Sequence, residues 1–145
     1  MFGINNSKDK LEILESDFKK FTANPLDISL AEKTCSDAWH MADWLFEEQK
    51  QADKSLTKKI FRDSLFSECP EMKILHDIAN TYKHKTLDRP KVFIKKTEKR
   101  EGGFSSGFSK GFDVSRLEVY FSNNKKIDLD DLIHIAIDYW KSKLS

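Results

Sequence analysis

Glycine is concentrated in one short stretch of this chain, and that distribution limits the folds open to the remainder. Four of the five glycines lie between residues 102 and 111, and the chain has only three prolines. The 145 residues include 11 phenylalanines, three tryptophans and three tyrosines, which is enough apolar side chain for a substantial core. We therefore expect a single domain, residues 1–145, built mainly of helices.

Apolar residues recur at steps of three and four along most of the chain, the spacing that places side chains on one face of a helix. In the second apolar segment small residues form a narrow seam, which favours close approach of a neighbouring helix. Asn24–Pro25 separates the first two segments, and Asp128 is placed to cap the last one. The predicted helices cover about 7–21, 26–50, 56–66, 70–85 and 128–144.

The segment between the last two helices has a different pattern. Val92–Ile94 and Leu117–Phe121 are rich in β-branched and aromatic residues, which predicts two strands. Residues 102–112 combine glycine with a phenylalanine every four positions, and they lack the Lys-Ser/Thr ending of a phosphate-binding Walker loop. The prediction is a mainly α fold: a four- to five-helix bundle with a β-hairpin and a Gly/Phe loop, residues 90–122, inserted before the last helix.

The segment Asp77–Lys85 carries the most distinctive chemistry in the chain. Asn80 and His84 are one helical turn apart and share a face, with Asp77 three residues before Asn80. A histidine that titrates near neutral pH, the ammonium groups of Lys83 and Lys85, and an amide together suit a phosphate-handling site. The alternative is that these residues only complement the negative end of the helix dipole.

Positive charge is concentrated directly after this segment. Residues 83–100 hold eight Lys or Arg and two acidic residues, a net charge of +6, although the whole chain has a net charge of only +1. Arg89, Lys95 and Lys96 belong to this block and are candidate contacts for a polyanion. A solvated strand that uses lysines to protect a sheet edge is the alternative explanation.

A second histidine–carboxylate pair lies in the second predicted helix. His40 and Asp43 are three residues apart, between Trp39 and Trp44. Such a pair is more often a half-buried hydrogen bond than a catalytic dyad. We keep both residues as candidate supporting groups of a binding site.

Several classes of protein are disfavoured by what the sequence lacks. Its start has no basic residue followed by an apolar run, and no apolar run approaches the roughly 20 residues that span a bilayer. Cys35 and Cys69 have neither metal-ligand spacing nor the number needed for a disulfide framework. We expect a cytoplasmic protein with two buried thiols, no metal, no cofactor and no membrane contact.

Two resemblances rest on these residues. Ala38–Trp44, His76–His84 and Gly103–Ser109 resemble three landmarks of a set of uncharacterised bacterial proteins with no established activity. More distantly, Asn80–His84 resembles the tail of the signature of the HEPN superfamily, helical bundles of toxin–antitoxin and phage-defence systems. Many of these are homodimeric, metal-independent ribonucleases. The arginine that opens their signature is replaced here by Ala79.

The resemblance implies an HEPN-like bundle that binds RNA or a nucleotide around Asn80, Lys83 and His84, as a homodimer and with a possible antitoxin or defence partner protein. One alternative is a ribonuclease in which His84 is the general acid or base, Asn80 orients phosphate or water, and Lys83 stabilises charge. Loss of the arginine removes a permanent, bidentate phosphate contact, which favours binding without catalysis. A protein-interaction domain that uses the Phe-bearing loop is the remaining alternative.

Overall fold

The computed structural model describes residues 3–83, 94–100, 116–121 and 126–145. Most of these residues are helical, as predicted. In chain order the elements are α1 (Ser7–Ala23), α2 (Ile28–Ala52), α3 (Lys58–Glu68), α4 (Met72–Lys83), β1 (Ile94–Arg100), β2 (Arg116–Phe121), β3 (Lys126–Asp128) and α5 (Leu129–Leu144).

Polar side chains fix where the first three helices begin. Asn6, Asp27 and Thr57 each accept a hydrogen bond from the backbone N–H three residues later, at 3.0, 3.0 and 3.2 Å. Each cap satisfies an N–H group that has no partner within its helix, which typically stabilises the helix by about 1 kcal/mol. The predicted helix boundaries agree with the observed ones to within about two residues, the usual variation at helix ends.

The starts of the last two helices differ in detail from the prediction. α4 begins at Met72, so Pro70 precedes the helix instead of opening it. Asp128 does occupy the position before α5, but its side chain does not accept the capping hydrogen bond. Asp130 and Asp131 lie in the first turn of α5, where their charge complements the helix dipole.

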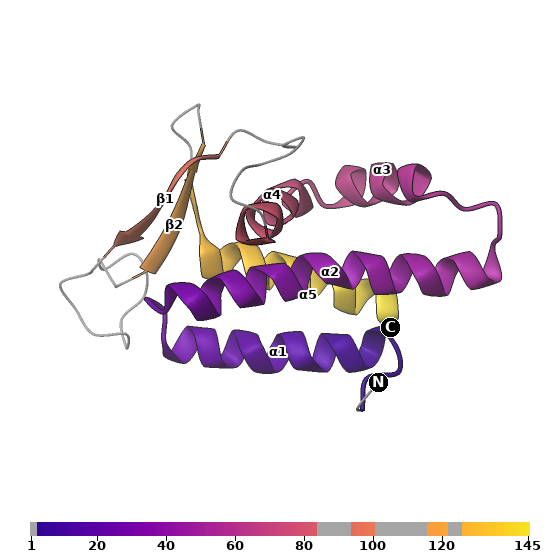
Figure 1. The fold of residues 1–145 in the computed structure, drawn as a ribbon, viewed down its shortest axis with the longest axis horizontal. Helices are drawn as coiled ribbons and strands as arrows, with labels where there is room; N and C mark the ends of the chain where they lie inside the picture. Colours follow the sequence, from indigo (N-terminus) through magenta and orange to yellow (C-terminus); the bar gives the residue numbers. More distant parts are fainter. Residues whose placement is uncertain (1–2, 84–93, 101–115, 122–125) are drawn as a thin grey trace.

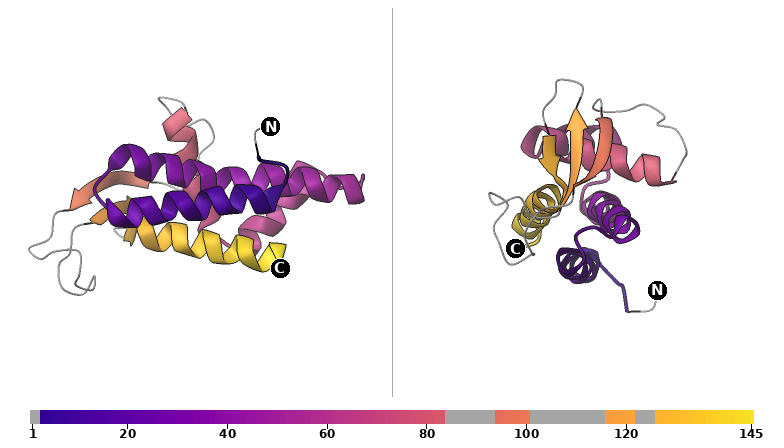
Figure 2. Two further views of the ribbon diagram at one scale, coloured as in Figure 1. Left: turned by 90° about the horizontal axis from the view of Figure 1, so that it is seen from below. Right: turned by 90° about the vertical axis from the view of Figure 1, so that its left-hand side faces the viewer.

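The core is formed mainly where α1, α2 and α5 lie side by side (Figures 1 and 2). Trp140 of α5 has no exposed surface, and its Nε1 donates a hydrogen bond to the carbonyl oxygen of Ala38 in α2 at 2.9 Å. The predicted small-residue seam of α2 is buried throughout: Ala31, Cys35, Ala38 and Ala42. Small side chains on α2 therefore give the large indole of α5 room to reach the α2 backbone.

A second layer, α3 and α4, covers α2 on the side away from α1, and α4 runs steeply across α2 (Figure 1). Phe61 and Leu65 of α3 are buried as predicted, but Ile60 is exposed instead of facing inward. The apolar face of α4 includes Leu75, Ile78 and Ala79, all buried. At this crossing the middle of α4 faces the part of α2 that carries Trp39.

The three strands form one antiparallel sheet in the order β1-β2-β3 at one end of the helices (Figures 1 and 2). Lys99 lies opposite Leu117, and Val119 lies opposite Ile127. β2 and β3 contact α5, so the sheet is held where the last helix begins. The predicted hairpin before the last helix is confirmed, and β3 is an additional short strand that the turn composition of residues 122–126 did not indicate.

Parts of two predictions fall outside the described residues. These parts are Val92 and Phe93 of the predicted first strand and the Gly/Phe loop at 102–112. Within the described chain, no helix has both the length and the apolar composition that crossing a membrane would require.

Candidate functional site

Three polar side chains in α4 form a continuous hydrogen-bonded chain, which we call the α4 relay. His76 Nδ1 lies 2.7 Å from Asp77 Oδ1, and His76 Nε2 lies 3.1 Å from Asn80 Nδ2. Asp77 is fully buried and His76 is 7% exposed, whereas Asn80 is only partly buried. The relay therefore runs from the protein interior toward its surface, and Asn80 is its outer member.

The donors and acceptors of the relay are mutually consistent. Nδ2 of Asn80 can only donate, so His76 Nε2 accepts from it. The ring proton then lies on Nδ1, which donates to Asp77 Oδ1. Every polar atom named here has a partner, which is the condition under which a buried polar network rigidifies its surroundings.

Aromatic rings from α2 and α3 hold the imidazole of His76 in place. Trp39 meets it edge to face, with ring centroids 5.0 Å apart, and Phe66 lies 6.4 Å away at a similar angle. Trp39 and Phe66 stack nearly parallel at 5.8 Å, and the Arg62 guanidinium lies 5.3 Å from the Trp39 ring centroid. Apolar rings on this side exclude water, which strengthens the hydrogen bonds of His76.

The pair His40 and Asp43 lies one residue from Trp39 on α2. His40 Nδ1 is 3.2 Å from Asp43 Oδ2, and both side chains are nearly half exposed. The hydrogen bond from His40 holds the pKa of Asp43 below its usual value, and the positive charges of Lys58 and Arg62 act in the same direction. The predicted pair therefore forms as a solvated hydrogen bond beside α3, not as a buried dyad.

The structure revises the predicted role of Asp77. It was expected to contribute a binding group on the polar face of the helix, but it is fully buried against His76. In the structure it is linked to Asn80 through the imidazole of His76. The helical period placed Asp77 and Asn80 on one side of α4, but it did not reveal that Asp77 is buried.

Other predicted site residues lie at or beyond the end of α4. Lys83 is the last residue of that helix, and Lys95 and Lys96 are in β1. His84, Lys85 and Arg89 lie outside the described residues. Whether Lys83 and His84 converge with Asn80 therefore stays a prediction.

Sequence reasoning did not select His76, the central residue of the relay. Its spacing of four residues from Asn80 is the same signal that selected His84, and it directly precedes Asp77. What the sequence could not show was the contact with Trp39, because those residues are 37 positions apart.

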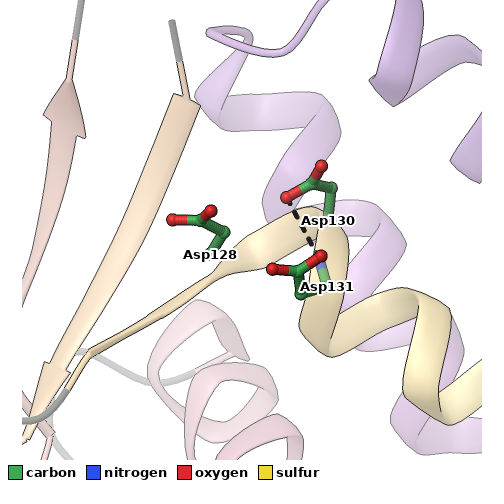
Figure 3. Close-up of side chains that lie close together, drawn as sticks. All are labelled: Asp128, Asp130 and Asp131. Atoms are coloured by element: carbon green, nitrogen blue, oxygen red, sulfur yellow. Dashed lines mark hydrogen bonds between the residues drawn. The ribbon is translucent and has the colours of Figure 1, made fainter. Parts of the chain in front are cut away.

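The start of α5 brings together three carboxylates. Oxygens of Asp128, Asp130 and Asp131 lie within 4.8 Å of one another (Figure 3), and the Asp131 backbone N–H donates to Asp130 Oδ1 at 3.0 Å. Carboxylate oxygens suit hard divalent cations, but acidic residues are also favoured at helix N-termini for their charge alone. Within the described residues no further feature at this position indicates a cation.

A hollow of about 170 Å³ lies between α2, α3 and α5, apart from the α4 relay. Its polar end is Glu68, which accepts hydrogen bonds from the Tyr139 hydroxyl at 3.0 Å and Lys143 Nζ at 2.6 Å. The Lys143 contact, followed by that of Tyr139, lowers the pKa of Glu68. Burial, followed by the Glu68 contact, raises the pKa of Tyr139. This network joins α3 to α5.

Neither a protein-family model, nor a curated protein, nor a solved structure matches this chain. The resemblances to the uncharacterised bacterial set and to the HEPN superfamily therefore stay predictions.

Proposed function

We propose that this protein binds a nucleotide or nucleic acid at the carboxyl-terminal end of α4, with Asn80 as a polar contact to the ligand. The observation that carries the proposal is the α4 relay, in which a fully buried carboxylate orients a histidine that in turn orients a surface amide. An amide held in this way meets a ligand without losing further side-chain entropy, which is how binding sites are preorganised.

Capping of a helix end does not account for this arrangement. A histidine or asparagine that only complements the helix dipole is exposed and hydrogen-bonds to water. His76 is instead enclosed by Trp39 and Phe66, with both ring nitrogens engaged. Burying these groups has a desolvation cost, which the hydrogen bonds of the relay partly offset. The same hydrogen bonds fix the orientation of Asn80.

The charge of the following segment supports a phosphate-bearing ligand. The block of residues 83–100, with its net charge of +6, begins at the last residue of α4. Four of its cationic residues fall in β1: Lys95, Lys96, Lys99 and Arg100. A cluster of this kind attracts polyanions and makes their binding strongly dependent on salt.

Binding is favoured over cleavage by the residue before Asn80. Ala79 occupies the place of the HEPN arginine and is only 3% exposed, packed in the core. The methyl group of Ala79 contacts the core, and unlike an arginine side chain it has no charge to offer a scissile phosphate. Ribonuclease activity through His84, a homodimer and a toxin or defence partner remain predictions that the same purified protein can test.

The direct test is titration of a fluorescently labelled single-stranded RNA with the protein, followed by anisotropy at several salt concentrations. Asn80→Ala should weaken binding about two- to tenfold, the effect of one hydrogen bond. Asn5→Ala, which truncates an exposed asparagine near the amino terminus, is the matched control and should leave binding unchanged.

Replacing the four cationic residues of β1 with alanine should reduce the slope of log affinity against log salt by up to about 2.8, at about 0.7 per phosphate contact of a single strand. A matched variant removes four exposed lysines elsewhere: Lys8, Lys19, Lys20 and Lys54. Equal salt-dependence slopes in the two quadruple variants would contradict the proposal. They would indicate that the lysines of β1 protect a sheet edge and do not contact phosphate.

A further inference from the structure

The hydrogen-bond polarity of the α4 relay determines which end of the Asn80 amide is presented to a ligand. Nδ2 of Asn80 can only donate, so Nε2 of His76 accepts from it, and the ring proton on Nδ1 is donated to Asp77. Oδ1 is then the end of the amide directed away from His76. Because the two contacts share one imidazole, the buried carboxylate and the orientation of the Asn80 amide are linked through His76.

From this polarity we infer that Asn80 is a specificity-determining residue that accepts a hydrogen bond from a donor on the ligand, either a ribose hydroxyl or a base N–H group. The inference rests on the proposed function and narrows it. Phosphate oxygens are acceptors and do not pair with Oδ1, so phosphate recognition is left to the cationic residues. A ribose 2′-hydroxyl is the group by which proteins distinguish RNA from DNA.

Asp77→Asn tests the inference because it is isosteric and reverses the polarity of the relay. The amide introduced at position 77 donates to Nδ1, so the ring proton moves to Nε2 and donates toward Asn80. The Asn80 amide then turns so that Oδ1 faces His76 and its two N–H groups face the ligand. Asp138→Asn is the matched control, because Asp138 pairs with His134 on the exposed face of α5.

The first readout is the protonation pattern of His76, obtained from ¹⁵N NMR of the imidazole at neutral pH without ligand. In the wild type and in Asp138→Asn we expect the proton on Nδ1, and in Asp77→Asn on Nε2. A wild-type ring protonated at Nε2, alone or together with Nδ1, would overturn the inference. This measurement is independent of whether the protein binds any nucleic acid.

The second readout is binding of three single strands of about 12 nucleotides, within the usual site size of single-strand binding proteins. They are oligouridylate, its deoxy counterpart, and an abasic deoxyribose-phosphate strand. The wild type should prefer oligouridylate to the deoxy strand about two- to tenfold if the donor is the ribose hydroxyl. If the donor is the base, the preference should instead be for the deoxy strand over the abasic one.

In either case Asp77→Asn should reduce that preference toward unity, while Asp138→Asn retains it. Identical ratios in the wild type and in an Asp77→Asn protein whose ring proton is on Nε2 would overturn the inference even if all three strands bind. Should Asp77→Asn fail to fold or keep the ring proton on Nδ1, Asn80→Ala replaces it, and an unchanged preference would again overturn the inference. If the wild type binds none of the strands at low salt, the proposed function is wrong, and the specificity inference fails with it.

Discussion

Two histidine–aspartate pairs, one inside α4 and one on the surface of α5, have the same chemistry in opposite surroundings. His76 and Asp77 lie 2.7 Å apart with side chains that are 8% and 0% exposed. His134 and Asp138 lie 3.2 Å apart, and both side chains are 63% exposed. The buried pair contacts a third polar side chain, Asn80, and packs against Trp39 and Phe66, whereas His134 lies 6.1 Å from the ring centroid of Phe18. Burial therefore distinguishes a histidine–aspartate pair that orients a third side chain from one that remains a surface contact.

The largest difference between the pairs is expected in stability. His76→Ala should lower the free energy of unfolding by about 3 kcal/mol, because it leaves a fully buried carboxylate without the imidazole donor. His134→Ala, the matched control, should change it by less than about 0.5 kcal/mol. Urea denaturation of both variants measures the two values. Similar losses in both would show that burial does not distinguish the pairs.

The outer member of the relay should have a smaller effect. Asn80→Ala removes one hydrogen bond from a partly buried amide and leaves His76 Nε2 reachable by water. We expect a loss of about 1 kcal/mol in the free energy of unfolding, from the same urea experiments. A loss as large as that of His76→Ala would mean that Asn80 is itself part of the core, not a surface group held by it.

The pair of His40 and Asp43 is an intermediate case and should show a pH dependence. The hydrogen bond from His40 is the main cause that lowers the pKa of Asp43 in the folded state. Asp43 therefore stabilises the folded state at pH values above the pKa of the unfolded chain, near 3.8. This contribution is lost as the pH falls through the lowered folded pKa. Asp43→Asn should therefore reduce stability by a few tenths of a kcal/mol at pH 7, because solvent screens a half-exposed carboxylate.

Thermal melting of the wild type and Asp43→Asn between about pH 2 and pH 7 checks this expectation. The two curves should separate above about pH 4 and converge at the acidic end. A constant difference at every pH would assign the effect to packing rather than to charge.

The exposed pair should have the smallest effect. Asp138→Asn is expected to alter the free energy of unfolding by less than about 0.5 kcal/mol, and raising the salt concentration should remove even that change. Denaturation at low and high salt measures it. A larger effect that persists at high salt would show that the α5 pair contributes more to stability than a screened charge contact.

The sequence predicted the helices and the hairpin because those features depend on local periodicity and on turn and cap residues. The period correctly predicted which residues are buried for the small residues of α2 and for Phe61 and Leu65. It failed for Ile60, which is exposed because only a narrow face of α3 is covered. The third strand escaped prediction because three residues are too few to show an alternating pattern.

The candidate site was predicted only in part, for a related reason. Asn80 was selected from its spacing and is the outer member of the relay. His76 was missed because its surroundings depend on contacts with α2 and α3, and the burial of Asp77 was not predicted. Helical spacing shows which residues share a face, but the tertiary packing decides whether that face is covered.

Binding at the relay is tested most directly by NMR of the Asn80 side chain. In uniformly ¹⁵N-labelled protein, the two protons on Asn80 Nδ2 give a resolved pair of signals, which Asn80→Ala identifies by their absence. Addition of oligouridylate should shift this pair together with backbone signals at the end of α4, and the signals of the α5 surface around His134 should stay in place. Saturable binding that leaves the Asn80 side-chain signals unmoved would contradict the account.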